Sequence, residues 1–427
     1  MGEQPLTGAR RLAQWRPFER MRNMAMAIRA RAAALAAAVL VSLATPAVAA
    51  GCQNSGSFER WLDGVRQEAA SLGISRATIA AALDGLTYDP AVVARDRGQG
   101  VFQQSFLQFS DRMVSSDRLQ QGARLMKTQA GLFSRIEQKY GVPAAVIIAF
   151  WALESDFGSN NGKYPILRAV ATLAYDCRRP DYFRPELFDA LRVIDRGDLK
   201  PSEMMGDWAG ELGALQITPS DYFKYAVDFD GDGRRDLIRS VPDTLASAAN
   251  FLVGLGWKRG EPWVQEVRVP EQLPWDQADL AIQHPRSKWS SWGVTLANGR
   301  PLPADALPAS LLLPMGRHGP AFLAYNNFKA YLGWNQAMVY STTAAYLATR
   351  LEGAPPVSRG TGSVVMLSSR QLLELQQLLV RQGYKLTTVD GKLGLATRAV
   401  VKEAQLKLGM PADSFPTPEL IERLRAR

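Results

Sequence analysis

The most restrictive feature of this chain is an apolar stretch, residues 142–158, that carries a single glutamate, Glu154, near its end. Pro143 suits the first turn of a helix, where its missing N–H has no intrahelical partner. Gly158 suits the left-handed residue that commonly follows the last turn. The residues three, four and seven positions before Glu154 are all large and apolar. We therefore predict a helix whose buried stripe includes this carboxylate.

A carboxylate in such a position has two readings. Desolvation disfavours the charged form and raises the pKa of a carboxyl group, which suits a general acid working near neutral pH. The alternative is a structural acid paired with an arginine or with a helix N-terminus. The sequence motifs described below favour the interpretation of Glu154 as a catalytic acid.

Composition excludes several function classes. The chain has 427 residues, 47% of them hydrophobic and 21% charged, as expected for two or three soluble globular domains. The net charge of +9 comes from residues 1–50 and 365–427, so the centre is nearly neutral and lacks the basic stripe of a nucleic-acid binder. Two His and two Cys cannot build a zinc site of the usual kind without using every one of them. The sequence also lacks the nucleophile-elbow motif of α/β-hydrolases, the glycine-rich dinucleotide-binding motif and the P-loop motif. We therefore expect carboxylate chemistry that requires no cofactor.

The N-terminus resembles an export signal over residues 1–50. Three arginines between positions 22 and 31 precede an apolar run, and small residues at 47–49 form an A-x-A-like cleavage site. The true start is then expected within Met21–Met26. A membrane-spanning helix is the alternative, since the apolar run is almost long enough to span a bilayer. We predict export to the periplasm of a Gram-negative bacterium.

Cys52 follows the cleavage site and has two possible roles. Export favours a disulfide between Cys52 and Cys177, the only pair the chain offers. Alternatively, residues 49–52 form a lipid-attachment box, which would anchor the protein to the outer membrane. Membrane contact is expected only through the signal sequence or such an anchor.

The chain is predicted to be mainly α-helical, with a large domain at 55–351. Helices are expected over Ser57–Ser71, Phe102–Met113, Leu119–Tyr140, Asp243–Leu255, Gly319–Leu332 and Gln336–Leu351. A region rich in Pro and Trp, Glu261–Leu313, is expected to form a small β-containing insert with a strand at Val264–Val269.

A linker rich in Gly and Pro, residues 352–364, separates this domain from a small module at 365–427. Three helices are expected in the module, over Ser369–Gln382, Ala396–Leu408 and Thr417–Arg425. It has no catalytic cluster, so a binding role is the default.

A glycine-containing stretch, residues 207–222, carries Gln216. Gly210 and Gly213 would let a ligand approach the backbone closely. The amide of Gln216 offers an acceptor and donors, which suits a sugar hydroxyl or N-acetyl group. The alternative is a tight helix contact with a structural glutamine.

An acidic loop that begins at Asp228 matches the first half of a calcium loop, with acids at positions one, three, five and nine and Gly at six. The candidate ligands are Asp228, Asp230, Asp232, Asp236 and Asp243. Arg239 stands where position twelve requires Glu, and Asp243 would have to close a longer loop. The alternative is a solvated acidic turn. Any calcium here would be structural.

Four ordered blocks over residues 55–350 resemble the lytic murein transglycosylase B family. They are Ala152–Gly158, Ala171–Arg179, Gly210–Ser220 and Tyr225–Gly233. The module resembles a peptidoglycan-binding domain of the three-helix type, through motifs between Leu375 and Gln405.

The resemblance implies a lysozyme-like helical catalytic domain. By position, Glu154 matches the single catalytic acid/base of the family. Residues that match glycan-contacting positions are Gln216, Arg178, Arg179, Trp334, Asn335 and Tyr340. Trp334 stands where the family often has Tyr, and aromatic stacking on sugar faces is expected of Trp334 and Tyr340.

The implied reaction uses one carboxylate to cleave the bond between N-acetylmuramic acid and N-acetylglucosamine in peptidoglycan and to form a 1,6-anhydro ring. Asp156 should face away from Glu154, because two residues correspond to about 200° around a helix. One alternative is a hydrolytic muramidase with a second acid such as Glu211. Another is a wall-binding scaffold without activity. Expected partners are glycan strands and enzymes of cell-wall synthesis or remodelling, with no nucleic acid.

Overall fold

The structure is a computed structural model that describes residues 56–98 and 104–426. These residues belong to one compact unit. The expected export signal and Cys52 lie outside the described residues, so export and the pairing of Cys52 with Cys177 stay predictions. Within the described ranges, every helix is too short or too polar to cross a bilayer.

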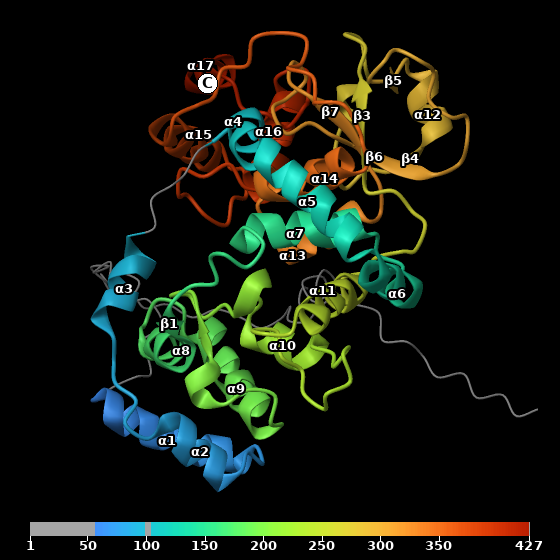
Figure 1. The fold of residues 1–427 in the computed structure, drawn as a ribbon. Helices are drawn as coiled ribbons and strands as arrows, with labels where there is room; N and C mark the ends of the chain where they lie inside the picture. Colours follow the sequence, from blue (N-terminus) through green and yellow to red (C-terminus); the bar gives the residue numbers. More distant parts are fainter. Residues whose placement is uncertain (1–55, 99–103, 427) are drawn as a thin grey trace, which may run out of the picture. The chain divides into compact units, whose positions relative to one another are not determined.

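Helices dominate the large domain, as predicted (Figure 1). They are α1 (Phe58–Ser71), α2 (Arg76–Leu83), α3 (Pro90–Arg97), α4 (Phe106–Met113), α5 (Ser116–Thr128), α6 (Ala130–Tyr140), α7 (Ala144–Ser155), α8 (Ile166–Tyr175), α9 (Pro180–Asp195), α10 (Pro219–Tyr225), α11 (Val241–Gly254), α13 (Phe328–Trp334) and α14 (Met338–Leu351). Three short 3-10 turns are η1 (Pro201–Glu203), η2 (Gly213–Leu215) and η3 (Trp275–Gln277).

Capping residues explain where two helices differ from the predicted bounds. The expected helix from Phe102 begins only at Phe106, because Ser105 and Gln108 form a reciprocal capping box there. The expected helix Leu119–Tyr140 is two helices that meet at Gln129, the C-cap of α5 and the N-cap of α6. Apolar periodicity continues across this break, which is why the sequence pattern concealed it.

Most strands lie in the insert. A five-stranded antiparallel sheet has the order β4-β6-β7-β3-β5, and a two-stranded sheet pairs β1 with β2. The strands are β1 (Tyr164–Pro165), β2 (Met205–Gly206), β3 (Val264–Arg268), β4 (His284–Pro285), β5 (Thr295–Leu296), β6 (Pro308–Leu312) and β7 (Ala321–Ala324), and α12 (Arg286–Ser291) follows β4. The small β-containing insert is thus confirmed, with a separate apolar core around the fully buried Trp289.

One helix expectation was wrong. The segment predicted as a helix from Gly319 to Leu332 begins as strand β7, which pairs with β3 and β6 in the centre of the sheet. All four β7 residues are buried, so this apolar run satisfies its backbone groups by sheet pairing. The helix α13 begins only at Phe328.

The C-terminal module has the three predicted helices, α15 (Ser369–Arg381), α16 (Leu395–Lys407) and α17 (Pro418–Arg425). They enclose an apolar core that includes Leu375, Val401 and Leu420. Residues 352–364, predicted as a linker, form neither helix nor strand.

α7 is the central helix of the large domain. Ten of its twelve residues are buried, and it packs against α5, α6, α11, α14 and η2. It begins at Ala144 with Pro143 as its N-cap, and Asp156 adopts the left-handed conformation after its last residue. A helix that is apolar on every face belongs in a core. Glu154 is the one charged side chain that α7 carries.

Candidate active site

The carboxylate of Glu154 accepts two side-chain hydrogen bonds, and both reach the same oxygen. The indole Nε1 of Trp334 donates to Oε1 at 2.9 Å, and the phenol of Tyr340 donates to the same atom. The other oxygen, Oε2, has no hydrogen-bond partner among the residues that the structure describes. Glu154 also takes part in no ion pair within those residues. The structural alternative of an arginine-paired glutamate therefore does not apply to the described part of the chain.

Burial raises the pKa of Glu154 to about 7, and the hydrogen bonds from Tyr340 and Trp334 oppose that rise. The residue keeps partial solvent exposure, as a group that must reach a substrate requires. A carboxyl group with this pKa is populated both as acid and as base near neutral pH, which is the condition for donating and recovering a proton in one cycle.

The indole of Trp334 packs against aromatic side chains of the protein. Its ring packs against Phe150 with 4.2 Å between centroids and against Phe251 with 4.9 Å. The indole is thus committed to the apolar packing beside α7, which aims its N–H at Glu154. Burial raises the pKa of Tyr340 well above its ordinary value, so the phenol keeps its proton and stays a donor. These two hydrogen bonds orient the carboxyl group of Glu154, and the stacking of Trp334 and Tyr340 on sugars stays a prediction.

Gln216 lies directly after η2 with a left-handed backbone (φ 47°). Its Nε2 donates to the carbonyl of Gly213 at 2.8 Å and to that of Asn161 at 3.4 Å. These bonds fix the orientation of the amide. Its Oε1 has no partner among the described residues, so it is available to accept a hydrogen bond from a sugar hydroxyl or N-acetyl N–H.

The glycines near Gln216 serve internal packing. A Cβ at Gly213 would lie 2.4 Å from the carbonyl oxygen of Leu237, and one at Gly210 would lie 2.4 Å from a methyl group of Val170. Both glycines also have positive φ. Tight contacts inside the protein therefore require both glycines, and the close approach of a ligand stays a prediction.

Hydrogen bonds of Ser155 connect the C-terminal end of α7 to the turn η2. Ser155 Oγ donates to the carbonyl of Ala214 and accepts from the amide of Gly158 at 2.8 Å. Asp156 and Phe157 both have positive φ, at 53° and 59°, although neither is glycine. Consecutive left-handed residues are strained and persist only when their surroundings hold them. The strained residues begin two positions after Glu154 in the chain.

The arginine pair lies on the loop between α8 and α9, and a buried acid holds it. Asp96 on α3 is 1% exposed, and its carboxylate pairs with Arg178 at 2.5 Å and with Arg179. Arg178 also donates to the backbone carbonyl of Asp96 at 2.6 Å. The two arginine side chains keep roughly 40% exposure, so part of each still faces solvent. Asp96 was not among the site residues predicted from the sequence, where it stands between Arg95 and Arg97.

Asn335 follows α13 directly. Its Oδ1 accepts from the amide of Ala337 at 2.9 Å, and its carbonyl accepts from Ser341. These bonds shape the turn between Trp334 and Tyr340. The described contacts of Asn335 are thus those of a residue that supports the two donors.

Two other carboxylates were candidates for a second catalytic acid. Asp156 forms an exposed ion pair with Arg118 at 3.0 Å. It follows the last residue of α7 with a left-handed backbone, so the helical spacing used in the prediction does not apply to it. Burial raises the pKa of Glu211 to about 8, and the nearby carboxylates of Asp207 and Glu154 add to that rise. Glu211 is therefore mostly protonated at neutral pH, which makes it a poor base for activating water.

The acidic loop brings three of the five candidate metal ligands together. Carboxylate oxygens of Asp228, Asp230 and Asp232 lie within 4.8 Å of one another. Asp243 instead accepts three backbone N–H groups, from Phe229, Asp230 and Asp236. These hydrogen bonds close the loop in the structure, and a role of Asp243 as a metal ligand stays a prediction.

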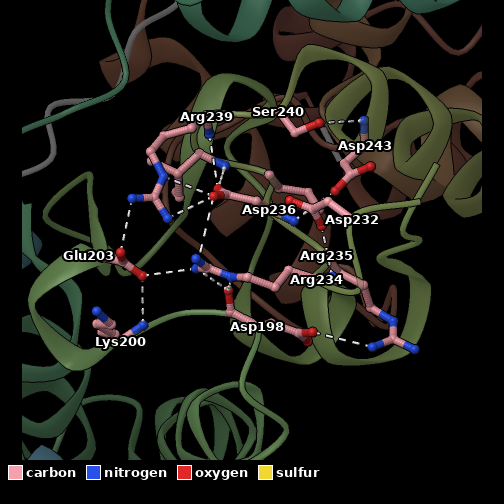
Figure 2. Close-up of polar contacts among 12 residues, drawn as sticks. Asp198, Lys200, Glu203, Asp232, Arg234, Arg235, Asp236, Arg239, Ser240 and Asp243 are labelled. Atoms are coloured by element: carbon pink, nitrogen blue, oxygen red, sulfur yellow. Dashed lines mark hydrogen bonds and ion pairs between the residues drawn. The ribbon is translucent and has the colours of Figure 1, made fainter. Parts of the chain in front are cut away.

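Arginines occupy the other end of the loop (Figure 2). Asp236 pairs with Arg239 at 2.8 Å, and Arg239 also reaches Glu203 at 2.9 Å. Arg234 donates to Glu203 at 3.1 Å and to the carbonyl of Asp198 at 2.8 Å. The three clustered carboxylates fit the first half of a calcium loop, whereas guanidinium groups occupy its second half.

Comparison with known proteins identifies the fold family. The family profile described as "Transglycosylase SLT domain" matches residues 57–349. The chain belongs to this family. A second profile, for a peptidoglycan binding domain, matches residues 368–424. The resemblance found in the sequence and the expected class of enzyme are thus confirmed, as is the lysozyme-like, mainly helical fold.

Solved structures agree with the assignment. SltB3 from Pseudomonas aeruginosa, in complex with NAG-anhNAM-pentapeptide, is 39% identical, with a TM-score of 0.80 over 86% of this chain and 99% of that chain. The Escherichia coli lytic transglycosylase Slt35, in complex with calcium, is 27% identical, with a TM-score of 0.58 over 71% of this chain and 94% of that chain.

A comparison of sequences gives a further similar protein. Membrane-bound lytic murein transglycosylase B of Escherichia coli (strain K12) is 34% identical over 158 residues, which cover 37% of this chain and 44% of that protein. The match thus spans less than half of that relative.

Proposed function

We propose that this chain is a lytic transglycosylase that cleaves the β-1,4 bond between N-acetylmuramic acid and N-acetylglucosamine and forms 1,6-anhydro-N-acetylmuramic acid. The observation that carries the proposal is the asymmetry at Glu154. Two protein donors hold Oε1, while Oε2 has no protein partner among the described residues. A proton on Oε2 is then available to a substrate oxygen.

The reaction needs one proton donated and one recovered. Protonated Glu154 donates to the glycosidic oxygen as the bond to C1 of the muramic acid breaks, and the bonding electrons leave with that oxygen. Trp334 and Tyr340 stabilise the carboxylate that results. The acetamido carbonyl of the substrate stabilises the cationic C1. Glu154 then takes the proton of the C6 hydroxyl, whose oxygen bonds to C1 and closes the ring.

The reaction described in this way consumes no water and requires no second carboxylate. Support for it comes from the raised pKa of Glu211, which disfavours the base that a hydrolytic muramidase would need. Support also comes from the complex of the related SltB3 with an anhydro-sugar peptide. The free Oε1 of Gln216 and the exposed edges of Arg178 and Arg179 are proposed to contact the glycan.

The same proposal places the protein in the periplasm of a Gram-negative bacterium, in agreement with the export signal expected at residues 1–50. A calcium ion is proposed as a structural accessory, held by Asp228, Asp230 and Asp232. Slt35 in complex with calcium supports such a site in the family. The ion would neutralise three adjacent carboxylates and would take no part in the reaction.

The test is release of soluble muropeptides from purified sacculi by the full chain and by Glu154→Gln. The proposal expects release by the wild-type chain and a loss of at least about 1,000-fold in the variant, because the only acid/base is removed. Full release by Glu154→Gln would refute the catalytic role. Sedimentation of the wild-type chain with sacculi but without release would favour the scaffold alternative.

A further inference from the structure

A cavity of about 640 Å³ includes Tyr340 in its lining, and three separate parts of the chain supply most of that lining. One wall is α4, a second is the start of α14 with the turn before it, and the third belongs to the C-terminal module. The volume falls within the range of small-ligand sites, about 300–1,000 Å³. Neither the proposed reaction nor the three-helix fold of the module accounts for it.

We infer that this cavity binds the stem peptide of the peptidoglycan strand. The inference rests on the proposed function, because it names a second part of the same substrate. The C-terminal module then forms one wall of the substrate site, in addition to any attachment to the cell wall.

The lining of the cavity favours an apolar ligand that carries negative charge. Most of its surface comes from apolar side chains, which include Phe109, Met338, Leu393 and Phe415. No Asp or Glu lines the described cavity, whereas it has three cationic residues. A stem peptide combines alanine methyl groups with free carboxylates. A bare glycan strand is uncharged apart from its lactyl groups and would gain little from such a lining.

Two of the cationic residues have no acidic partner among the described residues. Arg112 on α4 is exposed, stacks on Phe109 and donates to the amide oxygen of Gln104 at 2.9 Å. Lys392 in the module is also exposed and forms no ion pair in the described part of the chain. Exposed cations without an acidic partner, contributed to an apolar cavity by α4 and by the module, are complementary to an anionic ligand.

The third cationic residue fixes the module in place. Arg398 is buried and donates to the carbonyls of Leu313 at 3.2 Å and Pro314 at 2.6 Å. Lys402, also buried, pairs with Asp279 at 3.2 Å. Buried polar contacts of this kind give a defined geometry. The wall that carries Lys392 is therefore held against the large domain by more than the linker.

One residue contacts both the cavity and the catalytic group. Tyr340 lines the cavity and donates its hydroxyl proton to Glu154. The stem peptide is attached to the muramic acid whose glycosidic bond is cleaved. A peptide site next to Tyr340 is thus placed where the proposed reaction would deliver the peptide.

The experiment measures binding without turnover, so it does not depend on the reaction. Full-length Glu154→Gln is titrated calorimetrically with glycan strands that carry stem peptides and with the same strands after an amidase has removed the peptides. We expect tighter binding of the peptide-bearing strands. Each exposed charge is expected to contribute about two- to fivefold. The preference should weaken as the salt concentration rises.

The variants Arg112→Glu and Lys392→Glu, combined in the Glu154→Gln background, should reduce this preference to near one. Matched controls are Arg124→Glu and Lys385→Glu, which reverse exposed charges outside the cavity. The controls should keep the full preference, because they change the net charge equally.

Equal affinity for the two kinds of strand would overturn the inference, as would an unchanged preference in the double variant. A preference lost equally in the controls would show an effect of net charge only and would also overturn it. Failure of the wild-type chain to form anhydro products would refute the proposed function and leave this binding result intact.

Discussion

Trp334 Nε1 lies 2.9 Å from Oε1 of Glu154, and the indole that carries it is packed against Phe150 of the same helix α7. The apolar core thus holds the donor and the acid in one rigid unit. This relationship explains how a carboxyl group with a raised pKa can keep a fixed orientation. It also makes the pKa of Glu154 sensitive to a single indole N–H.

Trp334→Phe should move the alkaline limb of the pH profile of kcat/KM to higher pH by about one unit. The indole N–H stabilises the ionised form of Glu154, so its removal raises the pKa and keeps the acid protonated to higher pH. The control Trp292→Phe changes a tryptophan in the insert. A limb that stays in place in Trp334→Phe would show that the hydrogen bond does not tune the acid.

Glu154→Gln should be more stable than the wild type at high pH. The folded-state pKa is about 7 against an ordinary value of 4.5. The stability that the neutral carboxyl group supports is fully present below pH 4.5 and is lost as the pH rises through 7. Denaturant unfolding at pH 8.5 should therefore give the variant an advantage of about 2–3 kcal/mol.

At pH 4 the difference between Glu154→Gln and the wild type should vanish, because both side chains are neutral there. Glu403→Gln, which replaces an exposed glutamate, is the matched control. An equal free energy of unfolding at pH 8.5 for Glu154→Gln and wild type would mean that Glu154 is not shielded.

The sequence predicted the burial of Glu154 for a reason that is only partly correct. The spacing argument placed the carboxylate on an apolar stripe, but α7 is buried on nearly all faces. What the spacing could not show is the pair of donors, because Trp334 and Tyr340 lie about 180 residues away along the chain. Their side chains were expected to stack on sugars. Only the packing of α13 and α14 beside α7 reveals their contact with the acid.

Long-range pairing also limited the prediction of the fold. Strand β7 reads as part of a helix in isolation, because a short buried apolar run has no periodicity of its own. Its partners, β3 and β6, decide its conformation. By contrast, α1 and α15 were predicted within one residue, because a serine N-cap marks the start of each.

Asp96→Asn should lower the free energy of unfolding by about 1–3 kcal/mol. Burial opposes ionisation of Asp96, but Arg178 and Arg179 hold its pKa below the ordinary value. The contribution of this pair is present above the ordinary pKa near 3.8 and is lost as the pH falls below it. Denaturant unfolding at pH 7 measures the effect. An unchanged stability would show that the arginine pair is free for the glycan.

Calcium should raise the melting temperature slightly, by about 1–3 °C at a concentration tenfold above the dissociation constant. Three carboxylates give a weak site, and the contacts of Arg239 with Asp236 and Glu203 should keep the loop folded without metal. Asp232→Asn should abolish the shift, whereas Asp117→Asn, at an exposed position elsewhere, should keep it. Unfolding by a chelator alone would contradict this account.

The central claim is that Glu154 works as the only acid/base and that no water enters the product. Its most direct test is digestion of sacculi by the full chain in water enriched in oxygen-18, followed by mass analysis of the released muropeptides. The account predicts termini lighter by one water than reducing ends and free of the heavy isotope. Reducing termini that contain oxygen-18 would show hydrolysis and would contradict it.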